Sequence, residues 1–330
     1  MRISWRDGIH LQYKNVEMLL DPIINICNRA PVFISHGHHD HSFAFRLKNA
    51  LKFSSIETMH LVSAFGAKIE NWQRLTLHKK VMIDDIEVIP RNSGHVLGSY
   101  EFEICSPDGS ILFTGDFNTE YTKTMRPAEP VHCDVLILEA TFGSPSFTFP
   151  PKEKVANEMV TWAKNMIREG KCPTFQTDPL GNAQEVTRIF NEAGIPVVTH
   201  WKVTRVSDIY RSYGYKLEYV DEKSEDAKEI IETKNFVFIT PKNYNVRNRR
   251  EYVPALVSGW AVFARREAFP LSDHADFPNL IKFVEECKPK VLLTCHGEKY
   301  DECFARYVES KLKIRAYPIH LIPTYITREG

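Results

Sequence analysis

Residues Ser35 to Ser42 form the densest group of potential metal ligands in the chain. The stretch reads SHGHHDHS, so four of the 13 histidines lie close together and a carboxylate directly precedes the last of them. Imidazole nitrogens and carboxylate oxygens are the usual ligands of Zn²⁺ and related divalent cations. The stretch therefore predicts a metal site, which needs further ligands from elsewhere in the chain.

The neighbouring residues predict that this stretch lies on a loop between a strand and a helix. Pro31 to Ile34 is a short apolar run with β-branched and aromatic residues, as in a buried strand. Phe43 to Lys48 is expected to form the first turns of a helix, with Ser42 as its N-cap. Side chains on such a loop can converge on one point.

Three further candidate ligands lie near the ends of predicted strands. His95 sits in a glycine-flanked loop, where the backbone can approach a site closely, while Asp116 and His296 each follow a short apolar run. One histidine after a strand is more often structural than a ligand. Together with the first stretch, however, these residues supply enough ligands for two Zn²⁺ ions that share a carboxylate and a bridging water. The seven candidates are His36, His38, Asp40, His41, His95, Asp116 and His296.

Composition predicts a soluble, cytoplasmic protein. The chain has 330 residues, of which 43% are hydrophobic and 25% charged, and Lys+Arg equals Asp+Glu at 42 each, so any surface for an anionic partner must be local. The seven cysteines include no Cys-x-x-Cys pair, which favours reduced thiols. No apolar run approaches the roughly 20 residues of a membrane span, and the N-terminus has no signal-peptide pattern.

The hydrophobic pattern divides the chain into a part rich in strands and a part with alternating helices and strands. In the first part we expect a mixed or antiparallel sheet structure with strands at Ile9–Tyr13, Val16–Leu20, His60–Ser63, Val81–Pro90, Tyr100–Cys105, Ile111–Thr114 and Val135–Leu138. From about 149 the alternation favours a parallel α/β unit, with helices at Glu153–Arg168, Ala183–Ala193, Ser207–Tyr213 and Ala227–Thr233 and strands at Ile195–Thr199 and Phe236–Thr240. The last part contains the expected strand Val291–Thr294 between helices Phe277–Glu286 and Tyr300–Leu312.

The ligand pattern H-x-H-x-D-H, followed in order by His95, Asp116 and His296, resembles that of the metallo-β-lactamase superfamily. The resemblance implies an α/β fold, an αββα sandwich with its metals at one edge. It also implies a division of the ligands between two zinc ions. One would be held by His36, His38 and His95, the other by Asp40, His41 and His296, with Asp116 bridging. His39 occupies a variable position of the motif and is left outside the ligand set.

Two further residues are similar to motifs of the β-CASP nucleases within that superfamily. Glu139, in LEATFG, resembles motif A, and His274, in LSDHAD, resembles motif B, while His296 would be motif C. The segment PLGNAQE at 179–185 resembles a signature of their cap domain. The implied domains are 1–148, the first part of the metallo-β-lactamase domain, 149–255, an inserted α/β β-CASP cap, and 256–330, the completing part.

The resemblance implies hydrolysis of nucleic-acid phosphodiesters, because Glu139, His274 and the insertion are not needed by small-molecule hydrolases of this fold. Two cations lower the pKa of a bridging water and bind a phosphate oxygen. His274, oriented by Glu139, is the expected proton donor to the leaving oxygen, which predicts 5′-phosphate and 3′-hydroxyl ends. Asp40→Ala is expected to abolish turnover by emptying a metal position. The cofactors are expected to be two Zn²⁺ ions, with Mn²⁺ or Fe as alternatives.

Segments 257–260 and 271–277 look most like those of short prokaryotic ligase-associated DNA exonucleases, which are related to Artemis-like proteins and mRNA 3′-end processing factors. We therefore expect an intracellular prokaryotic nuclease that prefers DNA, acts as an exonuclease in DNA repair or processing, and associates with proteins of DNA repair or RNA processing. The alternatives are an RNA 3′-end processing endo- or exoribonuclease, a thioesterase of the glyoxalase II type, and a non-catalytic subunit.

A local basic segment is the candidate surface for gripping the substrate. Within 242–250 there is no acidic residue, and Arg265 and Arg266 follow shortly. Cationic side chains bind phosphates and an aromatic ring can stack on a base, although a solvated loop has the same composition. The candidates are Lys242, Tyr244, Arg247, Arg249 and Arg250.

Overall fold

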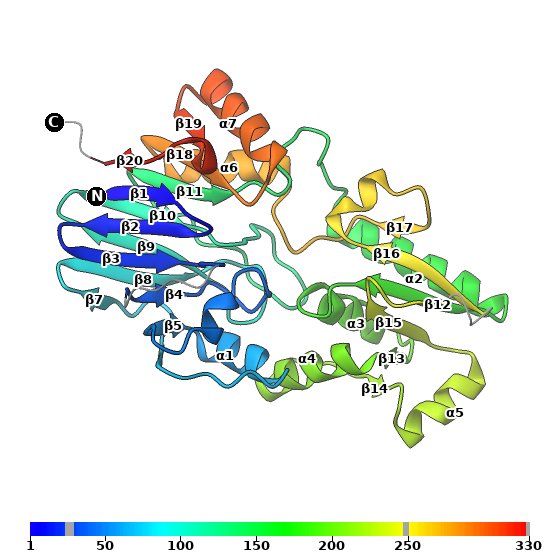
Figure 1. Cartoon of the computed structure of the whole chain (residues 1–330). Coiled ribbons are helices and arrows are strands. Elements are labelled where there is room, and N and C mark those ends of the chain that lie inside the picture. Colours follow the sequence, from blue (N-terminus) through cyan, green and yellow to red (C-terminus); the bar gives the residue numbers. More distant parts are fainter. Residues whose placement is uncertain (24–29, 247–250, 328–330) are drawn as a thin grey trace. The chain divides into compact units, whose positions relative to one another are not determined.

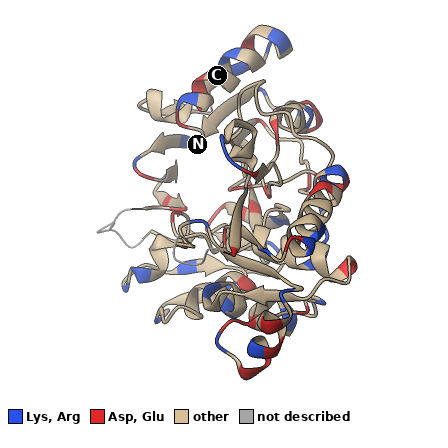
Figure 2. Cartoon of the chain, turned by 90° about the vertical axis from the view of Figure 1, so that its right-hand side faces the viewer, with Lys and Arg blue, Asp and Glu red and all other residues tan. Residues whose placement is uncertain are grey.

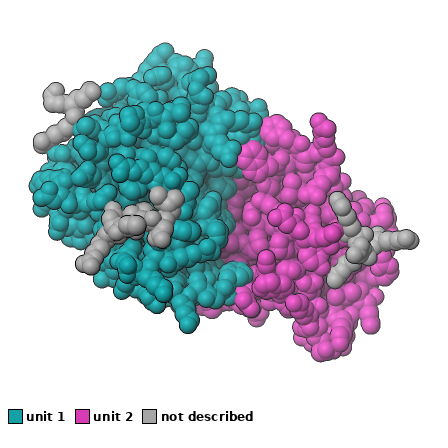
Figure 3. Space-filling model, viewed as in Figure 1, with its two compact units in different colours: residues 1–121, 126–148, 274–330 teal, residues 122–125, 149–273 magenta. Residues whose placement is uncertain are grey.

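The structure is a computed structural model that describes residues 1–23, 30–246 and 251–327 (Figure 1). The chain divides into two compact units, which Figure 3 colours separately. Unit 1 comprises Met1–Tyr121, Arg126–Thr148 and His274–Gly330, and unit 2 comprises Thr122–Met125 and Phe149–Asp273. Unit 1 is therefore built from segments on both sides of the inserted unit 2.

Unit 1 contains two seven-stranded sheets. In spatial order, the first consists of β20 (Tyr325–Ile326), β1 (Arg2–Trp5), β2 (Ile9–Tyr13), β3 (Val16–Leu20), β4 (Val32–Phe33), β5 (Lys52–Ser54) and β6 (Trp72–Arg74). The second consists of β19 (Arg315–Pro318), β18 (Val291–Cys295), β11 (Val135–Glu139), β10 (Gly109–Phe113), β9 (Tyr100–Ser106), β8 (Ile86–Asn92) and β7 (Val81–Ile83). Both sheets mix parallel and antiparallel pairs, as the sequence pattern predicts.

The two sheets of unit 1 share an apolar core. Phe33 of the first sheet stacks on Phe53 with ring centroids 4.8 Å apart, and its edge meets Phe102 of the second sheet at 5.6 Å. All three rings are buried, and burying such a side chain stabilises the fold by about 1.5–3 kcal/mol. In β2, β8 and β9 the apolar residues alternate with other residues, so the apolar side chains of these strands point into the same core.

Helices cover the outer faces of both sheets, which gives the αββα arrangement. The first sheet is covered by η1 (Phe43–Arg46) and α1 (Ile56–Ser63), and the second by α6 (Phe277–Cys287) and α7 (Lys299–Leu312). A short turn, η3 (Ile319–Leu321), follows β19. The predicted α/β fold class, a metallo-β-lactamase-type sandwich, is confirmed.

The central strands of the second sheet run parallel, and this aligns their carboxyl ends. β10 pairs with β11 and β11 pairs with β18, with Glu139 opposite Cys295. The residues directly after these strands therefore lie at one edge of the sheet, where polar side chains can meet. His296 directly follows β18, Asp116 is the third residue after β10, and Glu139 is the last residue of β11.

Unit 2 is a six-stranded, fully parallel sheet covered by helices. Its strands in spatial order are β14 (Val220–Asp221), β13 (Val197–Thr199), β15 (Val237–Pro241), β12 (Cys172–Thr177), β16 (Tyr252–Val257) and β17 (Ala268–Phe269). Its helices are α2 (Lys152–Arg168), α3 (Asn182–Glu192), α4 (Trp201–Ser212), α5 (Glu225–Thr233) and the 3₁₀ turn η2 (Gly259–Phe263). The predicted parallel α/β texture is thus present.

Unit 2 extends beyond the residue at which the sequence pattern places the end of the insertion. The pattern places that end at 255, whereas the compact unit ends at Asp273. The physical reason is strand pairing, because β16 pairs with β12 and β17 pairs with β16 in the same sheet.

The segment Val81–Pro90, expected to be one strand, forms two strands, β7 and β8, which pair antiparallel. Two other local predictions in unit 1 are wrong. His60–Ser63, expected to be a strand, lies in α1, where Ser55 caps the helix by accepting a hydrogen bond from the Thr58 N–H at 3.0 Å. The expected helix at Phe43–Lys48 is a single 3₁₀ turn, and the Ser42 side chain makes no capping hydrogen bond. In both cases the local pattern is too short to separate the alternatives.

Charged side chains of both signs share the surface. Figure 2 shows Lys and Arg interspersed with Asp and Glu along the helices. Among the described residues, no helix combines the length and the apolar character needed to cross a bilayer. The six described cysteines are free thiols.

Candidate metal centre

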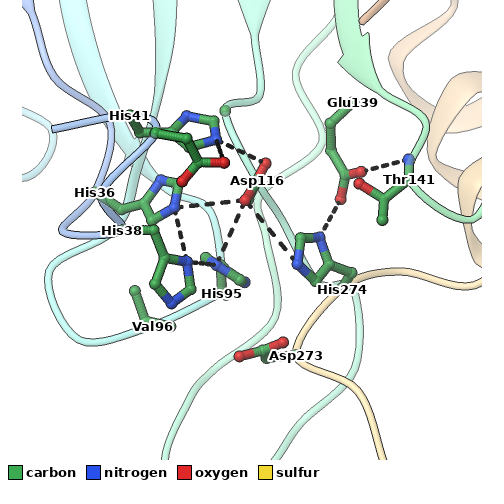
Figure 4. A network of polar contacts seen from close by, with 12 residues as sticks. His36, His38, His41, His95, Val96, Asp116, Glu139, Thr141, Asp273 and His274 are labelled. Atoms are coloured by element: carbon green, nitrogen blue, oxygen red, sulfur yellow. Dashed lines mark hydrogen bonds and ion pairs between the residues drawn. The ribbon is translucent and has the colours of Figure 1, made fainter. Parts of the chain in front are cut away.

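The histidine-rich stretch folds back on itself directly after β4. The N–H groups of His41 and Ser42 both donate to the carbonyl of His38, at 3.2 and 2.9 Å. This turn brings His36, His38 and His41 to the same side, where Figure 4 shows them beside Asp116. The structure thereby brings together residues that are close in sequence with residues of the second sheet.

Two glycines allow the remaining loops to approach the stretch. A Cβ on Gly94, whose φ is +72°, would lie 2.3 Å from the carbonyl oxygen of Asn118. A Cβ on Gly115, whose φ is +53°, would lie 2.7 Å from the Cβ of Ser35. Glycine is required where backbones come this close, and these two residues directly precede His95 and Asp116.

Four of the predicted ligands converge on one point. Nδ1 of His38 lies 3.1 Å from Nε2 of His36 and 3.0 Å from Nε2 of His95. Oδ2 of Asp116 lies 3.5 Å from Nε2 of His36 and 3.7 Å from Nε2 of His95. One ligand atom from each of the four residues lies within 4.8 Å of the others.

These separations match a tetrahedral metal site. Ligand atoms about 2.0–2.1 Å from a tetrahedral Zn²⁺ lie roughly 3.3 Å from one another. The four residues therefore have the chemistry and the spacing to hold one divalent cation. Three nitrogens and one carboxylate oxygen suit Zn²⁺ and also other first-row divalent metals.

The second predicted set is more open. Nε2 of His41 lies 3.4 Å from Oδ1 of Asp116 and 3.8 Å from Oδ2 of Asp40, whose side chain is 70% exposed. The His296 ring stacks on the His41 ring with centroids 4.5 Å apart. No hydrogen bond or ion pair joins His296 to either carboxylate in the described part of the chain. The structure thus brings His41 and Asp116 together and leaves Asp40 and His296 at the margin of the site.

One orphaned atom supports a cation on this side as well. Nε2 of His41 is buried and has no hydrogen-bond partner among the described residues. Burying a nitrogen that makes no hydrogen bond costs free energy, and a metal ion bound between it and Oδ1 of Asp116, 3.4 Å away, would satisfy it. The two carboxylate oxygens of Asp116 point to different imidazoles, Oδ2 to His36 and His95 and Oδ1 to His41. Asp116 is therefore placed to be a ligand of two cations, one on each side of its carboxylate.

Sequence reasoning missed Asp21, which orients His41. Asp21 is buried at the end of β3, and its Oδ2 accepts a hydrogen bond from Nδ1 of His41 at 2.7 Å. Its other oxygen accepts the N–H of Ser35 at 2.8 Å. A carboxylate behind a ligating histidine fixes which ring nitrogen faces the metal. The available signal is an Asp-Pro pair ending a strand, which by itself indicates only a turn.

The titration behaviour of the cluster also fits a cation site. Burial lowers the pKa of His36 well below 6.5, so its imidazole is neutral and can bind a metal. Burial alone would raise the pKa of Asp116, but the surrounding imidazoles, chiefly His41 and His274, hold it well below 3.8. For His41, burial acts to lower the pKa, but Asp116 and Asp21 outweigh it and raise the value to about 10. The field at His41 thus favours positive charge.

Glu139 and His274 form a hydrogen-bonded pair beside the cluster, also in unit 1. Nδ1 of His274 lies 2.9 Å from Oε1 of Glu139, which is completely buried. The second oxygen of Glu139 accepts the N–H of Thr141 at 2.9 Å. Nε2 of His274 faces Oδ2 of Asp116 at 4.0 Å (Figure 4). The pair therefore presents an oriented imidazole to the candidate metal site.

Residues outside the cluster have other partners. The exposed His39 accepts a hydrogen bond from Arg46 at 2.9 Å, in keeping with its exclusion from the ligand set. In unit 2, Lys242 is paired with Asp178, and Tyr244 packs its ring against His200 and Phe238. Arg247, Arg249 and Arg250 lie outside the described residues. The structure therefore describes only part of the predicted basic segment. The lysine in that part, Lys242, has its charge balanced by Asp178.

Comparison with known proteins identifies related families. Residues 260–318 match the family described as "Zn-dependent metallo-hydrolase RNA specificity domain". A protein named "Probable DNA ligase" from Opitutus terrae is 27% identical over 277 residues, which is 80% of this chain and 26% of that protein. "RNase aCSPSF2" from Saccharolobus solfataricus is 28% identical over 158 residues, 47% of this chain and 32% of that protein.

A third relative and a solved structure extend the comparison. "RNase J-like protein" from Methanocaldococcus jannaschii is 26% identical over 212 residues, covering 55% of this chain and 50% of that protein. The chain thus spans half or less of the length of these three relatives. A protein of unknown function from Enterococcus faecalis has a similar fold, with a TM-score of 0.66 at 14% identity over 91% of this chain and 95% of that one.

Proposed function

The chain belongs to the β-CASP nuclease group of the metallo-β-lactamase superfamily, and from this premise we propose that it is a metal-dependent nuclease that hydrolyses nucleic-acid phosphodiesters. The observation that carries the proposal is the position of Asp116. Its carboxylate faces the imidazoles of the ligand cluster and, at 4.0 Å, the His274 ring that Glu139 orients. A metal site and an oriented proton donor thus meet at one residue.

The cluster would hold two divalent cations, Zn²⁺ in the first instance, with Mn²⁺ or Fe as alternatives. His36, His38 and His95 would bind one ion and Asp40, His41 and His296 the other, with Asp116 shared. When bound, such ions polarise a phosphodiester and supply an activated water. Asp21 would keep Nε2 of His41 directed at its ion.

His274 would act as the general acid on the leaving oxygen. Glu139 accepts the proton on Nδ1, so the other ring nitrogen faces the reaction site. A buried carboxylate that accepts the Nδ1 proton favours the protonated form of its partner imidazole, which can then donate a proton from Nε2. Protonation of a 3′-oxygen leaving group yields 3′-hydroxyl and 5′-phosphate ends. Asp40, Glu139 and His274 are therefore the proposed catalytic residues.

We propose that the protein is an exonuclease that degrades DNA in repair or processing. A relative matched over 80% of this chain is named "Probable DNA ligase", which supports DNA. RNA 3′-end processing is the second candidate, because two relatives are named as RNases and the matched family is described by RNA specificity. Proteins of DNA repair or RNA processing are the proposed partners.

One cleavage assay tests the proposal and separates its alternatives. Single-stranded DNA, duplex DNA and RNA of one sequence, labelled at either end, are incubated with the full chain, with chelator, and with chelator followed by Zn²⁺ or Mn²⁺. We expect chelator-sensitive cleavage restored by metal, with ladders that show polarity and products that carry 5′-phosphates. A His36→Ala, His38→Ala double variant purified in parallel controls for contaminating nucleases. Failure to cleave any of the three substrates with metal present would remove the nuclease proposal.

A further inference from the structure

The turn η2 displays two exposed aromatic side chains in unit 2. Trp260 is 43% exposed and Phe263 is 56% exposed, whereas Gly259 and Ala261, before and between them, are buried. The Oγ of Ser258 caps the turn by accepting the N–H of Trp260 at 3.4 Å. The turn is thus anchored by small residues and presents its large apolar residues to solvent.

Helical geometry puts the two rings on one face. In a 3₁₀ turn the side chains at positions i and i+3 eclipse each other, and three residues rise about 6 Å along the axis. Trp260 and Phe263 have this spacing, so their side chains leave the turn on the same side. Exposing two large aromatic rings together is unfavourable in water, so such a pair marks a surface that contacts a ligand or partner.

Two arginines follow this aromatic pair after Ala264. Arg265 and Arg266 are exposed, and neither forms an ion pair within the described residues. Other arginines, such as Arg91 and Arg306, are paired with glutamates at 2.6 and 2.5 Å. The adjacent Glu267 is the one acidic residue in the same exposed run, so the run keeps a surplus of positive charge.

We propose that Trp260, Phe263, Arg265 and Arg266, the η2 surface, bind single-stranded nucleic acid. Bases stack on the two rings and phosphates contact the two guanidinium groups. The inference rests on the proposed nuclease function. It adds a surface, outside the candidate metal centre, that binds the nucleic-acid substrate. The surface follows the carboxyl end of β16 in a parallel sheet, the edge at which α/β sheets bind ligands.

Charge selects nucleic acid over a second copy of the chain as the occupant. In a two-fold dimer the same surface would face itself, so that four arginines would meet with two glutamates between them. Like charges at an interface oppose association, whereas a phosphate backbone complements them.

The test measures binding separately from cleavage. Fluorescence anisotropy with a labelled single-stranded oligonucleotide is recorded on the metal-loaded full chain carrying His274→Ala, which keeps the probe intact. Hydrolysis of bis(p-nitrophenyl) phosphate by each η2 variant in the wild-type background reports the metal centre independently, since this small diester does not need a gripping surface. Thermal unfolding followed by circular dichroism verifies that each variant folds.

Two variants probe the two kinds of contact. Trp260→Ala with Phe263→Ala is expected to raise Kd about 10- to 100-fold, the range that stacking of one or two bases supplies. Arg265→Gln with Arg266→Gln is expected to reduce the slope of log Kd against log salt by about 1.4, since each single-strand phosphate contact contributes roughly 0.7. Hydrolysis of the small diester is expected to be unchanged in both.

Matched controls lie elsewhere on the molecule. Phe65→Ala removes another exposed ring, 49% exposed in unit 1. Arg168→Gln with Lys171→Gln removes two charges before β12, at the opposite edge of the same sheet. Controls should bind like the parent, and equal losses in controls and test variants would overturn the η2 surface.

The outcomes separate this inference from the nuclease proposal. Unchanged Kd and salt slope in both η2 variants, with strong binding by the parent, would overturn the surface and leave the nuclease function standing. A shift of the parent from dimer to monomer in sedimentation on removing the rings would assign the surface to self-association instead. Oligonucleotide binding that depends on η2 without any metal-dependent hydrolysis would support the surface and remove the nuclease.

Discussion

Oδ2 of Asp21 accepts a hydrogen bond from Nδ1 of His41 at 2.7 Å, and the opposite nitrogen of the same ring faces Asp116 at 3.4 Å. A carboxylate at the end of β3 thus fixes the direction of an imidazole that the ligand motif contributes. This relation makes Asp21 a positioning residue for the proposed metal site.

Asp21→Asn is expected to weaken metal binding at this position by about 10- to 100-fold, the usual effect of losing a partner behind a ligating histidine. The amide keeps the size and tolerates the φ of +44° found at Asp21. Competition of the protein with a chromophoric chelator measures the affinity. Asp84→Asn is the matched control, because Asp84 also has a positive φ, of 51°, in an exposed turn away from the histidines. Equal affinity in the wild type and Asp21→Asn would show that His41 is not a ligand.

Asp116→Ala and Asp40→Ala are expected to differ in metal content. Asp116 faces three imidazoles of the cluster at 3.4–3.7 Å, so its loss should reduce occupancy of both metal positions. Asp40 lies 3.8 Å from His41 with an exposed side chain, so its loss should empty one position and abolish turnover. Elemental analysis after gel filtration counts metal ions per chain. Retention of two ions by Asp116→Ala would contradict a shared carboxylate.

His274→Ala is expected to retain the metal and lose turnover. The ring lies 4.0 Å from Asp116 without being part of the four-residue convergence, so metal content should stay at the wild-type level. Loss of a general acid lowers kcat by roughly 10²–10⁴-fold. The defect should shrink on a substrate whose leaving group needs no proton, such as a p-nitrophenyl diester. An equal defect on both substrates would assign His274 a role other than proton donation.

Glu101→Gln is expected to stabilise the protein at neutral and alkaline pH. Glu101 is completely buried on β9, and burial, reinforced by Glu129, raises its pKa well above 4.5. Between its ordinary pKa and the raised one the folded chain holds a proton that the unfolded chain releases, so the wild type loses stability as pH rises through this window. Glutamine removes that loss, so the stability difference between variant and wild type should grow as pH rises from the ordinary glutamate pKa toward the raised one.

Urea unfolding at several pH values measures this difference. Glu103→Gln is the matched control on the same strand, since Glu103 is paired with Arg91 at 2.6 Å and should lose stability when neutralised. A pH-independent difference for Glu101→Gln would show that the carboxyl is ionised in the folded protein.

The ligand cluster was predictable from sequence because several of its ligands are close together in the chain. Four ligands stand within His36–His41, and the others directly follow apolar runs or glycine-flanked turns near strand ends. The α/β class and the parallel texture of unit 2 were predictable for the same reason, since helix and strand periods are properties of short segments.

What escaped prediction depends on partners distant in the chain. Asp21 is marked by a hydrogen bond to His41, which no pattern around Asp-Pro reveals. The end of unit 2 at Asp273 depends on β17 pairing with β16. Likewise, Trp260 is exposed because the turn buries Gly259 and Ala261 instead, and the sequence pattern does not show which of these residues the turn buries.

The insertion of unit 2 has a consequence for the order of events during synthesis. β11 leaves the ribosome well before β18, its parallel neighbour in the second sheet, because most of unit 2 is made between them. Until β18 arrives, β11 can pair with β10 on one side only, which makes it an open edge strand. Its five residues are all buried in the finished fold, and such an exposed apolar edge is prone to aggregation. Unit 2 can meanwhile close its own parallel sheet from nearly contiguous sequence. A nascent chain of this protein therefore has an incomplete unit 1 while unit 2 is already folded. The proposed chemistry can begin only when His274 and His296 join the histidines made before the insertion.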